Sequence, residues 1–284
     1  MRPCNLPVCM QFSAHYHQVL IMKNVIRTSW RDAATLIVLS RKKPAIASRQ
    51  GVNYDILFQT RTASASFANS VVFPGGVSEP VDASEDWLRL FKAFGFDQSH
   101  FEAFHRPGAP ATPIFQDNPV KRHISLRITA IRETFEELGL LLCCKQHQKD
   151  RSSPWACVLP IADISKNPSE LLNLCKEYQC YPDIWALHYW SNWLTPTHFP
   201  KRFDAAFFIT ALEDKPECLD FNAEVAHVQV REFLYSLNPY GRFTIVCPNI
   251  IRHNVLFFII FICHKVIYFT LKELFSSELL FNLT

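Results

Sequence analysis

Residues Pro119–Leu138 combine an apolar and an acidic periodicity, and this combination predicts an amphipathic helix. At about 100° per residue, three glutamates fall within one arc roughly 100° wide, and the apolar residues fall on the opposite side. We expect Asn118 to cap the start of the helix and Gly139 to end it in a left-handed conformation. The acidic arc consists of Glu133, Glu136 and Glu137, and the apolar side of Ile128, Ile131, Phe135 and Leu138.

The acidic arc needs a compensating positive charge. Like charges three or four residues apart destabilise a helix by about 0.2–0.5 kcal/mol per pair. A divalent cation is the natural candidate, because Mg²⁺ and Mn²⁺ prefer hard oxygen ligands. The pattern therefore predicts a metal site on this helix.

Short apolar or alternating runs on both sides of the helix predict strands, so the expected class is α+β. Two further segments, Ser84–Phe94 and Ser165–Tyr178, have helical patterns, and Arg231–Leu237 is interpreted as a short terminal helix. The predicted strands are Ala33–Leu39, Tyr54–Thr60, Val71–Phe73, Leu140–Leu142, Ala205–Ile209 and Glu224–Val230.

The pair Gly75-Gly76 directly follows a predicted strand. It indicates either a backbone that needs positive φ or a close approach to another group, with an ordinary turn as the alternative. The segment between this loop and the acidic helix is rich in phenylalanine, which predicts a folded cover. Its rings are expected to pack in the core, the alternative being a groove for a substrate chain.

The amino-acid composition limits the partners and the cellular compartment that can be predicted. The chain has 49% hydrophobic and 19% charged residues and a net charge of +3, too small to predict nucleic-acid or anionic-membrane binding by itself. Its ten cysteines form no CxxC pair, which favours reduced thiols. Met1–Ser29 has no signal-peptide pattern. The apolar stretch 255–271 is interrupted by His264-Lys265, so a buried element is preferred to a membrane anchor.

The glycine loop and the acidic helix resemble the two halves of a Nudix box, Gx5Ex7REUxEExGU, where U is aliphatic. Gly76 matches the box glycine, and Arg132–Leu140 matches the second half apart from Thr134 at the aliphatic position. Asp82 stands where the box has glutamate, and a long insertion (about 83–125) separates the halves. The resemblance implies a Nudix α/β/α sandwich with a mixed sheet.

One branch, the peroxisomal coenzyme A diphosphatases of the Nudix motif 19 type, is similar in these departures and over about Trp30 to Asn238. It implies a hydrolase domain at 29–238, an N-terminal extension at 1–28 and an atypical apolar tail at 239–284. It also implies a peroxisomal location, although Asn282-Leu283-Thr284 is not a peroxisomal targeting tripeptide; the cytoplasm and mitochondrion are the alternatives. The shared segments are Phe73–Val77, Ala130–Glu137, Trp193–Pro196 and Lys201–Asp204.

This resemblance implies Mg²⁺- or Mn²⁺-dependent hydrolysis of coenzyme A or acyl-coenzyme A to 3′,5′-ADP and (acyl-)4′-phosphopantetheine. Glu136 and Glu137 are expected as metal ligands, and Glu133 as a further ligand or the general base. Two alternatives stay open: a Nudix pyrophosphatase acting on capped RNA or nucleotide sugars, and a catalytically impaired isoform that binds a nucleotide or a partner protein.

Further residues are expected around the substrate. Gly75 and Gly76 bring the loop backbone close to it, and Arg132 either holds a glutamate or contacts the substrate. Lys201 and Arg202 either meet the 3′-phosphate or form a solvated strand end. Glu224 is either one more metal ligand or a surface acid.

Overall fold

The computed structural model describes most of the chain between Trp30 and Val246 and divides it into two compact units. The first unit comprises Met1–Ile37 and Pro74–Thr210, and the second comprises Val38–Phe73 and Ala211–Thr284. The N-terminal extension, Glu224 and the apolar stretch 255–271 lie outside the described residues. These are 30–41, 54–64, 69–105, 112–150, 157–158, 167–197, 199–216, 218, 225–232, 234–237 and 243–246.

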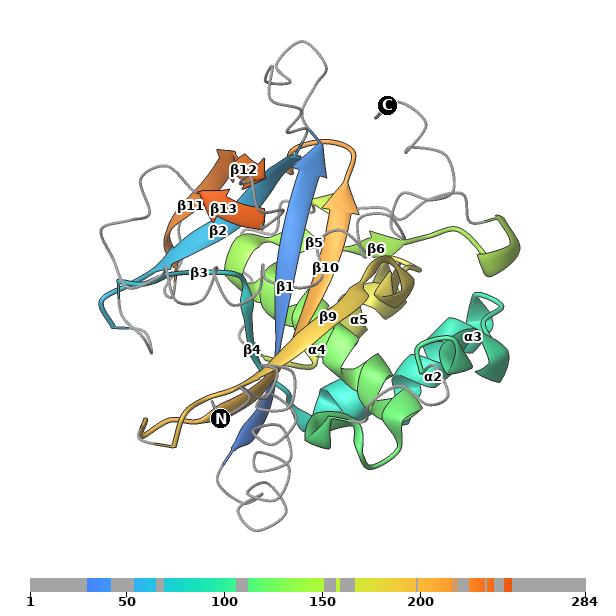
Figure 1. Ribbon diagram of the computed structural model, residues 1–284. Coiled ribbons are helices and arrows are strands. Elements are labelled where there is room, and N and C mark those ends of the chain that lie inside the picture. Colours follow the sequence, from blue (N-terminus) through green and yellow to red (C-terminus); the bar gives the residue numbers. More distant parts are fainter. Residues whose placement is uncertain are drawn as a thin grey trace, which may run out of the picture. The chain divides into compact units, whose positions relative to one another are not determined.

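The first unit contains a mixed sheet. The start of β1 (Arg31–Arg41) pairs antiparallel with β4 (Gly75–Val77), so that Ala34 stands opposite Gly76. On its other side, β1 neighbours β10 (Phe203–Leu212), and β10 pairs antiparallel with β9 (His188–Leu194). The arrows of β1 and β10 point the same way in Figure 1. Parallel and antiparallel neighbours thus occur together, as predicted.

Helix α4 (Pro119–Leu138) has the predicted bounds, because both of its ends are encoded locally. The side chain of Asn118 accepts a hydrogen bond from Lys121 N at 3.1 Å, and proline occupies the first helical position, where no donor is needed. Gly139 ends the helix with φ 67°. The helix is buried throughout His123–Arg132, so its burial extends well beyond the predicted apolar face.

The insertion forms α2 (Glu85–Ala93) and α3 (Gln98–Glu102). The α2 bounds confirm the helix predicted at Ser84–Phe94, with Ser84 as its N-cap. Phe91 and Phe96 are buried, and the Phe96 ring stacks on Trp185 with ring centroids 3.8 Å apart. These contacts favour core packing over a substrate groove for these rings.

Shorter elements complete the first unit. Helix α5 (Glu170–Glu177) lies within the segment predicted to be helical at Ser165–Tyr178, with Ser169 at its N-cap. Two small ladders join β5 (Leu140–Leu141) to β7 (Cys157–Val158) and β6 (Cys143–Cys144) to β8 (Tyr181–Pro182). The 3₁₀ turns are η3 (Pro80–Ala83), η4 (Pro113–Phe115), η5 (Gln148–Asp150) and η6 (Ile184–Ala186).

In the second unit, β2 (Tyr54–Arg61) pairs with the end of β1, with β3 (Val71–Val72) and with β11 (Val225–Glu232). The helix predicted at Arg231–Leu237 is wrong. β11 continues its ladder with β2 through Glu232, and β12 (Leu234–Leu237) pairs with β13 (Phe243–Val246). Cross-strand hydrogen bonds satisfy this backbone instead of helical ones. No helix formed by the described residues is long and apolar enough to cross a membrane.

Candidate active site

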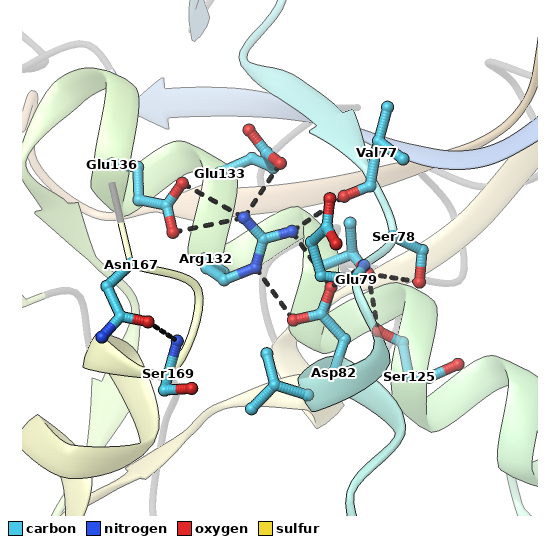
Figure 2. A network of polar contacts seen from close by, with 12 residues as sticks. Val77, Ser78, Glu79, Asp82, Ser125, Arg132, Glu133, Glu136, Asn167 and Ser169 are labelled. Carbon is cyan, nitrogen blue, oxygen red and sulfur yellow. Dashed lines mark hydrogen bonds and ion pairs between the residues drawn. The ribbon is translucent and has the colours of Figure 1, made fainter. Parts of the chain in front are cut away.

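The guanidinium of Arg132 lies at the centre of the polar network in Figure 2. Its Nε donates to Asp82 Oδ1 at 2.9 Å, and its Nη2 donates to Asp82 Oδ2 at 3.0 Å and to Val77 O at 2.8 Å. Its Nη1 donates to Glu133 Oε1 at 2.9 Å and to Glu136 Oε2 at 3.1 Å. Arg132 therefore joins the loop acid to two glutamates of α4 and holds them in place.

Asp82 is positioned by the turn η3. It is only 1% exposed, and it accepts further hydrogen bonds from Glu79 N at 3.0 Å and from Thr129 Oγ1 at 2.8 Å. The turn η3 places Asp82 next to the guanidinium of Arg132. Aspartate is shorter than the usual glutamate of the Nudix box, but here it still forms a bidentate ion pair. Thr129 was not predicted from the sequence. Its spacing of three residues before Arg132 on the same helix is the signal that could have identified it.

The two loop glycines are needed for different reasons. A Cβ on Gly76 would lie 2.5 Å from Glu133 Cδ, so the absence of a side chain allows the carboxylate to rest against the loop. Gly75 has φ 153°, which favours glycine, and its N–H donates to Glu137 Oε2 at 2.9 Å. The pair thus combines the close approach and the special backbone conformation that the sequence suggested.

Charge is concentrated at this site. Burial, followed by the negative charges of Glu137 and Glu136, raises the pKa of Glu133 to about 8 against the lowering effect of Arg132. Burial alone would lower the pKa of Arg132, but its hydrogen bonds to Asp82 and the charges of Asp82, Glu133 and Glu136 raise it overall. The single positive charge of Arg132 therefore does not fully compensate the negative charge of Glu133 and its neighbouring glutamates.

The glutamates fit a divalent cation by their chemistry. Glu133 and Glu136 retain 16% and 17% side-chain exposure, so both carboxylates reach solvent. In the present conformation they turn to Arg132, and Glu137 turns to Gly75 N. Within the described ranges no three acidic, histidine or cysteine side chains converge on one ion position. The donor set is nevertheless three hard carboxylates with excess negative charge.

Lys201 and Arg202 lie directly before β10. Lys201 is exposed, and the guanidinium of Arg202 lies over the ring of Trp30, with Cζ 5.0 Å from the ring centroid. The structure therefore brings Gly75, Gly76 and Arg132 together with the glutamates and places Lys201 and Arg202 at the strand end.

Comparison with known proteins identifies relatives. The family model of the NUDT19 Nudix domain matches residues 30–241. The chain is 34% identical over 242 residues to the acyl-coenzyme A diphosphatase NUDT19 of Xenopus laevis, an alignment that covers 72% of this chain and 62% of the relative. The protein of the same name from Gallus gallus is 32% identical over 238 residues, covering 74% of this chain and 61% of the relative.

The chain thus spans about three fifths of the length of these relatives. Among solved structures, the crystal structure of a NUDIX hydrolase from Alicyclobacillus acidocaldarius matches with a TM-score of 0.50 and 25% sequence identity. That match covers 71% of this chain and 78% of the other. The structural likeness confirms the predicted α+β fold with a mixed sheet.

Proposed function

Because the chain belongs to the NUDT19 Nudix domain family and is therefore a Nudix hydrolase, we propose that it hydrolyses the pyrophosphate bond of coenzyme A or acyl-coenzyme A. The products are 3′,5′-ADP and (acyl-)4′-phosphopantetheine. The names of the relatives, acyl-coenzyme A diphosphatases, support this substrate class. The hydrolase domain comprises 29–238, close to the matched residues 30–241.

The observation that carries the proposal is that Arg132 contacts acidic residues from both halves of the Nudix box. One guanidinium binds Asp82 of the loop half and Glu133 and Glu136 of the helix half of the box. The two halves are far apart in sequence, and the inserted α2 and α3 do not prevent them from meeting. The same guanidinium therefore brings acids from both halves of the box together.

Each residue has a role in this proposal. Glu136 and Glu137, together with Glu133 as a further ligand, would hold Mg²⁺ or Mn²⁺, and Arg132 and Gly75 N orient their carboxylates. A bound divalent cation neutralises the phosphate charges and lowers the pKa of its bound water. The carboxylate of Glu133 is alternatively the group that takes the proton of the attacking water.

The loop makes room for the substrate. Since Gly75 and Gly76 carry no side chains, their backbone lies close to the glutamates, and a pyrophosphate held by the glutamate-bound cation would meet it. Intact Glu133, Glu136 and Glu137 argue against a module that only binds nucleotides, because binding alone does not require all three.

The proposal is tested by measuring Mg²⁺- or Mn²⁺-dependent release of 3′,5′-ADP from coenzyme A and acyl-coenzyme A, with ADP-ribose, a nucleotide sugar and capped RNA as competing substrates. We expect coenzyme A or its esters to have the highest kcat/KM. Preference for capped RNA or a nucleotide sugar would replace the substrate assignment. No turnover of any of these, with nucleotide binding retained, would favour the impaired isoform.

A further inference from the structure

Arg202 differs from the other arginines of the first unit whose partners are described. Arg31, Arg89, Arg122 and Arg132 each lie within 4.0 Å of a carboxylate oxygen. Arg127 also lies over aromatic rings, but its guanidinium donates to two backbone carbonyls. Within the described part of the chain, the Nε of Arg202 is buried without a hydrogen-bond partner. Its contact is with the face of the Trp30 ring.

Trp30 is itself fixed in place. Its Nε1 donates to Thr195 O at 2.8 Å, and Thr195 is tied to Phe203 by two hydrogen bonds, Thr195 N to Phe203 O at 2.9 Å and Phe203 N to Thr195 Oγ1 at 3.0 Å. These hydrogen bonds attach the ring to the base of the β9–β10 pair. Stacking on such a ring orients the guanidinium of Arg202 but leaves its positive charge and its donors available.

This arrangement suits a phosphate. A buried donor without an acceptor is costly, and the fork of a guanidinium matches two phosphate oxygens. Lys201, the preceding residue, is exposed and adds a second cation at the same strand end. A phosphate monoester would supply acceptors and neutralise charge together.

The location relates Arg202 to the loop of the active site. Arg31 N donates to Arg202 O at 3.0 Å, and three residues further along β1, Ala34 stands opposite Gly76. Three residues of strand span about 10 Å. In coenzyme A the 3′-phosphate is separated from the pyrophosphate only by the ribose and its 5′-methylene group. A substrate bound in this way would lie along this part of β1.

We propose that Arg202, held by Trp30, binds the 3′-phosphate of the substrate and makes the enzyme prefer coenzyme A to dephospho-coenzyme A. This inference rests on the proposed function and adds the group that recognises the nucleotide end. Dephospho-coenzyme A lacks only the 3′-phosphate, so the ratio of the two kcat/KM values isolates this contact.

The experiment compares that ratio in the wild type, Arg202→Gln and Arg202→Lys, with Arg89→Gln as the control on the exposed side of α2. We expect Arg202→Gln to reduce the preference for coenzyme A roughly ten- to a hundredfold, the range for one charge-assisted hydrogen bond. Arg202→Lys should give an intermediate ratio, and Arg89→Gln the wild-type ratio. An equal loss on both substrates would mean a structural role and would overturn the proposal.

A binding measurement separates this inference from the proposed function. Calorimetric titration with 3′,5′-ADP and with AMP requires no turnover, so it stays informative if coenzyme A is not hydrolysed. We expect 3′,5′-ADP to bind more tightly, and Arg202→Gln to remove most of the difference. Inorganic phosphate is titrated in parallel: binding of phosphate at Arg202 with equal affinities for the two nucleotides would show a free-anion site and overturn the assignment.

Discussion

Arg132 and Asp82 form a two-pronged ion pair, with Nε–Oδ1 2.9 Å and Nη2–Oδ2 3.0 Å, although 50 residues separate them in the sequence. Their side chains are 2% and 0% exposed. The pair thus fastens the turn η3 to α4 in the interior. Because α4 also bears the glutamates, the same contact supports both the fold and the proposed metal site.

Removal of Asp82 should destabilise the protein strongly. In Asp82→Ala the buried guanidinium loses its principal partner, and we expect the free energy of unfolding to fall by about 3 kcal/mol, as for other broken buried pairs. Denaturant unfolding monitored by circular dichroism measures this. Asp214→Ala, at an exposed position, should change it by less than about 0.5 kcal/mol. Similar values for the two variants would contradict the role of the pair.

The two loop glycines should respond differently to alanine. In Gly76→Ala the added methyl group would displace the Glu133 carboxylate, and we expect kcat to fall about a hundredfold with little change in stability. In Gly75→Ala the methyl group would meet Ala34 O, and φ 153° is unfavourable for alanine, so stability should fall by about 1–3 kcal/mol. Activity assays and thermal unfolding of both variants distinguish these effects; unchanged kcat in Gly76→Ala would contradict the steric account.

Glu137→Gln should remove a metal ligand while preserving the local structure, because the amide oxygen can still accept the hydrogen bond from Gly75 N. We expect kcat to fall more than about a hundredfold, since even residues that only support ligands contribute ten- to a hundredfold. Glu102→Gln, on the exposed side of α3, is the matched control and should retain wild-type activity.

The same variants test metal binding without turnover. A Mn²⁺ or Mg²⁺ concentration of one hundred times Kd should stabilise the wild type and Glu102→Gln by about 2.7 kcal/mol. Chelation should reverse this, and Glu137→Gln should show a much smaller increase in Tm. Equal increases in the three proteins would place the cation elsewhere.

His123 should make the protein sensitive to acid. Burial, with the charges of Arg127 and His105, lowers its pKa from 6.5 to about 3. Below pH 6.5 the unfolded chain takes up a proton at this residue and the folded chain does not. Its contribution to stability is therefore lost as the pH falls from about 6.5 towards 3, by up to about 1.4 kcal/mol per pH unit.

His123→Asn removes this titration, so unfolding measured between pH 7 and pH 5 should show a shallower loss of stability than in the wild type. His227→Asn, at an exposed position, provides the reference and should keep the wild-type slope. A slope in His123→Asn equal to that of the wild type would mean that His123 does not stay neutral in the folded protein.

Local sequence was sufficient to predict the features that depend on neighbouring residues. Asn118, Pro119 and Gly139 predicted both ends of α4, because caps act within one helical turn. The spacing of Glu133, Glu136 and Glu137 predicted that they share a face. The terminal segment shows the limit of this reasoning: Arg231–Leu237 has a local pattern compatible with a helix, yet its backbone pairs with distant strands.

Long-range packing sets which distant groups meet at the site. Arg132 could have faced the substrate, but its donors are directed to Asp82, Val77 O and two glutamates, because η3 and β4 pack against α4. The need for glycine at position 76 likewise comes from a carboxylate on another element. Helical periodicity placed the three charges on one face of α4, and only long-range packing determined the partners of those charges.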